Sequence, residues 1–347
     1  MVDVNDLGEA KLPICTTPTV RENFLALEYS VFEAYERDLT PVLCNYYSNI
    51  VSGQDKHVQF SHLHEDKWLV KEKIMHQHHM TWHREMFENN HNELIEIIQK
   101  LIAQGYYLTG NYNAFYIKAK PAYHCYETNT VYLIYGYSQK ARTFYAIGKT
   151  SNRTFEPYEI GYDEYISAVF NRENGLFNLN FLKFNDDCVI KADIKKVHNG
   201  IYDYIHSKRK EDGPVPEGET KNYRYGLNCY RDFLKSLTNQ HEYRCYIEPV
   251  SYAVFLEHHI LMQKRIDYLI SVGIVDEKEI GIEYQRIVEQ SKGIYSSCLL
   301  YNTSFDPKLI KQIYNGVSTI IEDEQQLLSR LLERLRSYYS SRKADDN

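Results

Sequence analysis

Hydrophobic and polar positions divide the chain into three zones, of which the first runs to about residue 105. Its clearest element is 92–104, where apolar residues recur at the spacing of an amphipathic helix and Gly105 follows as a left-handed stop. We therefore expect this zone to be mainly helical. The apolar positions of its last helix are Leu94, Ile95, Ile98, Leu101 and Ile102.

The second zone, 106–194, is rich in residues that favour strands. β-Branched, aromatic and aliphatic side chains fill 131–137 and again 142–148, with a short polar turn between them, which predicts a central β-hairpin. A short helix is expected to begin at Asp163, because aspartate is a common helix cap and apolar residues follow it on one helical face. Two further strands are expected to close the sheet, at 181–184 and 188–192.

After residue 194 the pattern becomes helical again. It predicts one helix before a Pro- and Gly-rich loop at 207–222 and a second helix after that loop. Asp306 followed by Pro307 is a strong helix start, because the carboxylate caps free amides and proline suits the first helical position. One long amphipathic helix is expected from there to about Ser337. A separate buried stripe is expected at Phe255, Met262, Ile266 and Leu269.

The composition is that of a globular protein without a basic surface. The chain has 347 residues, of which 43% are hydrophobic and 25% charged, and its formal net charge is -7. Nucleic acid is therefore not an expected partner, because there is no broad positive surface to neutralise phosphates. The one dense basic run consists of Lys208, Arg209 and Lys210.

Neither a signal peptide nor a long apolar segment is recognisable, so we expect a cytoplasmic protein without a membrane partner. The seven cysteines are odd in number and include no Cys-x-x-Cys pair. They predict free thiols rather than a disulfide framework or a zinc site. We expect no bound metal and no cofactor.

Short motifs around the hairpin carry a family resemblance. Pro-Ala-Tyr-His at 121–124 precedes the hairpin and Tyr-Glu-Ile at 158–160 follows it, and further matching motifs stand at 106–107, 113–117 and 257–269. Over roughly 30–275, the chain resembles the butirosin-biosynthesis H protein N-terminal family, papain-like proteins related in fold to bacteriocin leader peptidases. The resemblance implies an α+β fold, with a papain-like cysteine-peptidase domain around a central antiparallel sheet and a helical C-terminal extension.

The implied domain organisation is a papain-like domain over 1–206, the loop 207–222 and a helical region over 223–347 packed on the first domain. The implied activity, in specialised-metabolite biosynthesis, is transfer of an acyl or peptidyl group from a carrier-protein thioester to a small amine acceptor through an acyl-cysteine. Cys44 is the expected nucleophile, because it follows Pro41 near the start of a predicted helix, where a helix dipole and an imidazole lower a thiol pKa. His124 is the expected base.

The expected partner of such an enzyme is an acyl or peptidyl carrier protein. Carrier proteins are usually acidic, so a chain of net charge -7 needs a local positive patch in order to dock one. We expect Lys208, Arg209 and Lys210 to provide that patch. The sequence does not indicate an oligomeric state.

Two positions depart from the family's catalytic triad. Thr130 stands where the resemblance requires a histidine, and the strand segment 146–149 lacks the expected carboxylate. The alternative function is therefore that of a catalytically degenerate binding or accessory protein with the same fold.

A histidine-rich segment suggests a third function, that of a zinc-dependent hydrolase. On a helix, His76, His79 and His83 would share one face with Glu72, a spacing that suits zinc. The segment also contains His78, but Gln77 replaces the glutamate that the usual metalloprotease motif needs after its first histidine.

Overall fold

The protein forms two compact units, each built from two stretches of the chain. Unit 1 comprises 1–37 and 67–189, and unit 2 comprises 38–66 and 190–347. The loop at 207–222 and residues 61–73 lie largely or wholly outside the part that this computed structural model describes. The described residues are 3–5, 8–19, 23–35, 40–45, 50–52, 58–60, 74–152, 154–171, 176–188, 191–208, 223–243 and 246–345.

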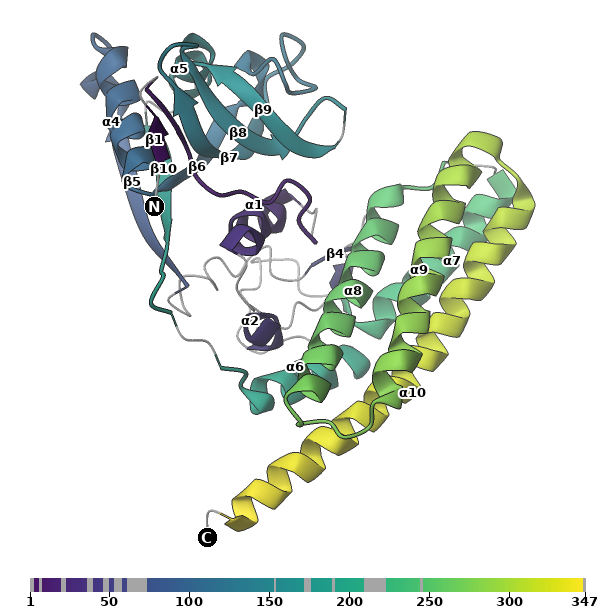
Figure 1. The fold of residues 1–347 in the computed structure, drawn as a ribbon. Helices are drawn as coiled ribbons and strands as arrows, with labels where there is room; N and C mark the ends of the chain where they lie inside the picture. Colours follow the sequence, from purple (N-terminus) through teal and green to yellow (C-terminus); the bar gives the residue numbers. More distant parts are fainter. Residues whose placement is uncertain are drawn as a thin grey trace. The chain divides into compact units, whose positions relative to one another are not determined.

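Unit 1 is organised around an eight-stranded antiparallel sheet (Figure 1). The strands follow the order β1-β2-β7-β6-β10-β5, and β8 pairs with both β7 and β9. Helices α4 and α5 pack against this sheet. The elements are β1 (Asp3–Asn5), β2 (Glu9–Lys11), α1 (Asn23–Phe32), β5 (Met75–His83), α4 (His91–Ala103), β6 (Tyr107–Asn113), β7 (Asn129–Ser138), β8 (Thr143–Lys149), β9 (Phe155–Gly161), α5 (Tyr162–Phe170) and β10 (Leu176–Phe184).

The predicted hairpin is confirmed as β7 and β8, which pair from Leu133 with Ile147 to Ser138 with Thr143. A β-bulge between Ile134 and Gly136 interrupts their register. The side chains of β7 from Leu133 to Ser138 are buried, as are Phe144, Ala146 and Ile147 of β8, which explains the dense run of aromatic and aliphatic residues in the sequence.

Helix α4 is also confirmed, and the Asn90 side chain caps it by accepting a hydrogen bond from the Glu93 amide. The prediction that the chain up to about residue 105 is mainly helical is confirmed only in part, because α1 and α4 share this zone with strands that include β1, β2 and β5. Helix α5 begins at Tyr162 with Gly161 as its cap, so Asp163 lies in the first turn instead of at the cap. The strand predicted at 188–192 is not observed in the three residues described there, which are Cys188, Lys191 and Ala192.

Unit 2 is mainly helical, and α8, α9 and α10 run side by side (Figure 1). Helices α6 and α7 pack on α10, and a small antiparallel sheet of order β11-β3-β4 completes the unit. The elements are α2 (Thr40–Asn45), β3 (Ile50–Ser52), β4 (Val58–Phe60), α6 (Ile194–Ile205), β11 (Arg224–Tyr225), α7 (Leu227–Tyr243), α8 (Pro249–Ser271), α9 (Glu279–Ser304) and α10 (Pro307–Asp345).

Local capping signals explain where several of these helices begin. Asp306 accepts a hydrogen bond from the Lys308 amide at 2.9 Å, and α10 starts at Pro307 as predicted. Glu248 caps α8 in the same manner, with Pro249 at its first position. The apolar stripes expected on α8 and α10 are buried, whereas α9 is a helix that the pattern analysis did not predict.

The division into units differs from the expected domains. Helix α6 and residues 38–66 group with the C-terminal helices, whereas the sequence analysis placed 1–206 together. Among the helices described, none combines the length and the apolar composition needed to cross a bilayer. Six cysteines are described and all are free thiols, as expected; Cys245 lies outside the described residues.

Candidate functional site

Cys44 lies in α2 of unit 2, and its side chain is completely buried. The helix begins at Thr40 beside Pro41, as the sequence predicted, but Cys44 is its fifth residue and lies beyond the first-turn amides. The guanidinium of the buried Arg265, on α8, donates from Nε to the carbonyl oxygen of Leu43 at 2.6 Å. A positive charge is thus held one residue before the thiol.

His124 lies in unit 1, in the turn that precedes β7, and is exposed. Its backbone has a φ of 51°, its amide donates to the carbonyl oxygen of Phe115, and its ring stacks on Tyr123 with centroids 4.0 Å apart. Thr130 pairs with Tyr112 of β6 and has no imidazole to offer. Since Cys44 and His124 belong to different units, an approach of the two remains a prediction.

Of the basic run, Lys208 is described and follows α6, whereas Arg209 and Lys210 lie outside the described residues. The Lys208 ammonium lies 4.8 Å from the centre of the Tyr202 ring. Its role in docking a carrier protein remains a prediction.

The prediction that the histidines share one face of a helix is wrong, because 75–83 forms strand β5. Side chains alternate between the two faces of a strand, so His76 and His78 are separated from His79 and His83. The His79 ring bonds instead to the Asn180 side chain on β10, at 2.8 Å. Glu72 lies outside the described residues.

Sequence reasoning missed a polar cluster inside unit 2, formed by His258 and His259 of α8 and Glu324 of α10. All three side chains are fully buried, and one ligand atom from each lies within 4.8 Å of the others. A signal was present in the sequence. Glu324 interrupts the apolar stripe between Ile320 and Leu327, where a carboxylate is out of place unless it has buried partners.

Hydroxyl groups surround the Glu324 carboxylate. Tyr204 of α6 donates to Oε2 at 2.7 Å, and Tyr284 of α9 donates to Oε1 at 2.5 Å. The His259 Nε2 atom lies 3.5 Å from Oε2 and 2.8 Å from the hydroxyl of Tyr230. This buried carboxylate of α10 is therefore tied to α6 and α9 through charge-assisted hydrogen bonds, and the His259 imidazole of α8 lies beside it.

Burial acts in opposite directions on the pKa values of two of these groups, a carboxyl and an imidazole. Burial raises the pKa of Glu324, but the adjacent His259 imidazole, together with His258 and the hydrogen bond from Tyr284, outweighs that effect, so the pKa lies below its ordinary value. Burial lowers the pKa of His258 to about 3, which keeps its imidazole neutral at physiological pH. The cluster thus combines an anionic oxygen with a neutral imidazole, a donor set that suits a metal ion such as zinc.

Unit 1 contains a second polar cluster, centred on Lys120. Burial lowers the pKa of its amine to about 8. The amine donates to the carbonyl oxygen of Lys149 and lies 5.0 Å from the ring centre of Tyr158. It is enclosed by protein, so it ties the turn before β7 to the end of β8 and offers no access to a substrate.

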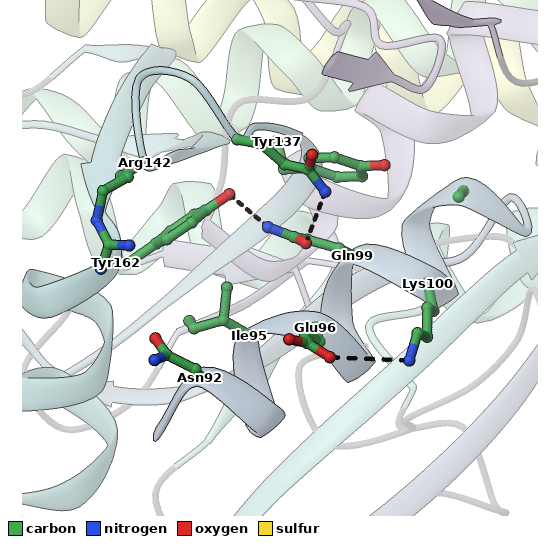
Figure 2. A pocket seen from close by; sticks show the side chains of 10 residues that line it. Asn92, Ile95, Glu96, Gln99, Lys100, Tyr137, Arg142 and Tyr162 are labelled. Carbon is green, nitrogen blue, oxygen red and sulfur yellow. Dashed lines mark hydrogen bonds and ion pairs between the residues drawn. The ribbon is translucent and has the colours of Figure 1, made fainter. Parts of the chain in front are cut away.

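A pocket of about 520 Å³ opens on unit 1 between α4 and the turn of the hairpin (Figure 2). Glu96 and Lys100 of α4 line it together with Arg142, so its wall carries charges of both signs. On its floor, Gln99 donates to the hydroxyl of Tyr162 at 2.7 Å. The arrangement suits binding of a small polar molecule and contains no nucleophile paired with a base.

Comparison with known proteins leaves the family open, since neither a protein-family model nor a curated protein matches this chain.

Proposed function

We propose that this chain is a binding or accessory protein of papain-like ancestry in specialised-metabolite biosynthesis, without covalent catalysis. The observation that carries the proposal is Thr130 at the start of β7, where the resembled family has its catalytic histidine. Strand β8 contributes no carboxylate to orient a base, and its Ala146 and Ile147 are core residues. The hairpin is therefore retained as a scaffold, while two members of the triad are absent from it.

The environment of Cys44 supports the same proposal. A reactive thiol needs access to substrate and an environment that favours the thiolate. The side chain of Cys44 is 0% exposed, and the six-residue helix that carries it adds little dipole field at its fifth position. The thiol behaves as a small core residue.

The pocket beside α4 supplies a binding site for the proposed role. Its volume of about 520 Å³ falls within the usual range for small ligands, about 300–1,000 Å³. Arg142 and Lys100 attract a carboxylate, and Glu96 attracts an ammonium group. A small zwitterion, such as an amino acid, is thus the ligand class that fits the lining best.

Thiol reactivity tests the absence of covalent catalysis. Cys125 is exposed in unit 1, so sub-stoichiometric iodoacetamide followed by peptide mapping should label Cys125 first and leave Cys44 unmodified until the protein unfolds. Selective labelling of Cys44 in the native protein at neutral pH would overturn the proposal.

A second candidate function is acyl or peptidyl transfer from a carrier-protein thioester to an amine, with Cys44 as nucleophile and His124 as base. The buried guanidinium of Arg265 favours it, because a cation close to a thiol lowers the thiol pKa. In that case, incubation with an acylated carrier protein adds the acyl mass to the chain. Cys44→Ala should abolish the adduct, whereas the matched control Cys125→Ala should retain it.

A further inference from the structure

We propose that His258, His259 and Glu324 bind one divalent transition-metal ion, with zinc as the best fit, in the interior of unit 2. In the part of the chain that is described, these are the only three His, Cys, Asp or Glu residues whose ligand atoms gather this closely. All three side chains have no exposed surface. The site thus lies in unit 2 and shares no residue with the histidine-rich strand β5 of unit 1.

The spacing of two of the three donor atoms supports a metal ion. His259 Nε2 and Glu324 Oε2 are 3.5 Å apart, which exceeds the usual hydrogen-bond distance of about 2.7–3.2 Å. Two ligands that each lie about 2.1 Å from a tetrahedral zinc ion are about 3.4 Å from each other. The two atoms are therefore spaced as neighbouring ligands are.

The surroundings of the ligands support it as well. A histidine that binds a metal through one ring nitrogen usually donates a hydrogen bond from the other, which fixes its tautomer. The Ser291 hydroxyl lies 2.5 Å from Nδ1 of His259, in place to accept that hydrogen bond. Tyr204 and Tyr284 donate to the two oxygens of Glu324 and fix the orientation of its carboxylate.

The donor set indicates which ion fits. Two imidazoles and one carboxylate suit zinc and related transition metals, whereas magnesium and calcium prefer oxygen ligands alone. The Tyr230 hydroxyl, 2.8 Å from Nε2 of His259, is our candidate for a fourth position. Because the site is closed to solvent, the ion has a structural role, in which it connects α8 to α10.

Without a metal ion, the same residues would form a hydrogen-bond network in which His259 Nε2 shares a proton with Tyr230. Metal content distinguishes the two states. Protein prepared without a histidine tag should contain one zinc ion per chain by elemental analysis, and its unfolding midpoint should fall when a chelator removes the ion and recover when zinc is added. A wild-type protein with no bound metal, and with a midpoint insensitive to chelator and zinc, would overturn the proposal.

Amino-acid substitutions test which residues bind the ion. Glu324→Gln should lose the zinc ion, whereas a control carrying His76→Gln, His78→Gln and His79→Gln on β5 should retain it. Should Glu324→Gln fail to fold, Ser291→Ala provides the test, since loss of an outer hydrogen bond typically weakens metal affinity about 10–100-fold. An affinity for zinc unchanged in Ser291→Ala would contradict the assignment.

Substitution of cobalt for zinc separates this site from the cysteines. Cobalt bound by nitrogen and oxygen ligands gives weak visible absorption, whereas cobalt bound by thiolate adds intense near-ultraviolet charge-transfer bands. We expect the first spectrum. A thiolate spectrum would assign the metal to cysteines and overturn the proposal.

Discussion

Individual polar residues inside this protein are stabilised in different ways. Lys120 is buried with its amine bonded to one carbonyl oxygen, and no carboxylate among the described residues forms an ion pair with it, so burial lowers its pKa to about 8. Glu324 is equally buried, but it accepts two phenolic hydrogen bonds and faces His259, so it remains ionised. Burial is the largest influence on both pKa values, and in Glu324 the combined effect of its imidazole neighbours and hydrogen bonds outweighs it.

Lys120 should make stability depend on pH. Its pKa of about 8 in the folded state is below the ordinary 10.5, so the unfolded chain binds more protons between these pH values and stability rises with pH. The rise amounts to at most about 3 kcal/mol. Urea unfolding at pH 7 and pH 9.5 should show it in the control Lys118→Met, whose lysine is exposed, and not in Lys120→Met. Equal pH dependence in the two variants would show that Lys120 is not the source.

The hydrogen bonds to Glu324 should be worth more than ordinary ones. Tyr284→Phe removes a donor to a buried carboxylate, and we expect it to cost about 2 kcal/mol in the free energy of unfolding. Tyr314→Phe, at an exposed position of α10, is the matched control and should change stability little. Similar values for the two variants in urea unfolding would argue that Glu324 is protonated or that water replaces the lost hydroxyl.

Among the secondary-structure elements, two strands approach each other so closely at one glycine that there is no room for a side chain. Gly136 of β7 pairs with Lys11 of β2, and a Cβ atom there would lie 2.5 Å from the carbonyl oxygen of Ala10. Pairing of β2 with β7 therefore depends on the missing side chain.

Gly136→Ala should destabilise the protein by about 2 kcal/mol, because the β2–β7 pair must move apart. Gly293→Ala is the control, and it should change stability in the opposite direction. Gly293 lies inside α9 with nothing near its Cβ position, so alanine should stabilise the helix by about 0.5–1 kcal/mol. Thermal unfolding of both variants measures the difference. A Gly136→Ala variant as stable as the wild type would mean that β2 is not held against β7.

How much of this could be predicted from sequence depends on how local each signal is. The hairpin and the start of α10 were predictable, because alternating strand-forming residues and the Asp306–Pro307 cap act within a few residues. Strand β5 was not, since only Met75 and Trp82 in it are buried and its pairing partner β10 lies about 100 residues away. The meeting of His259 with Glu324 likewise depends on packing of α8 and α10, which no spacing in the sequence encodes.

For the whole molecule, the net charge of -7 sets the long-range electrostatics. An acidic partner is repelled at a distance, and local basic residues then control how fast it associates. The run at Lys208, Arg209 and Lys210 would have that effect on a carrier protein.

Reversal of these three charges to glutamate should slow association with an acidic carrier protein, and the effect should shrink as salt shortens the Debye length below about 8 Å. Stopped-flow binding at several salt concentrations gives the association rate. Lys308→Glu with Lys311→Glu and Arg336→Glu, on exposed positions of α10, is the control for the change in net charge. A rate that falls equally in both variants would exclude a local docking patch, and no binding by the wild type at low salt would exclude a carrier partner.

The interleaved course of the chain governs the order in which the protein can fold during synthesis. Residues 38–66 belong to unit 2, yet the contacts of α2 with α6 and α8 form only after 67–189 and the later helices have left the ribosome. At about 5–20 residues per second, that delay is on the order of ten seconds. During this interval Cys44 lacks the helices that bury it, so we expect this thiol to be more vulnerable to oxidation in the nascent chain than in the finished protein.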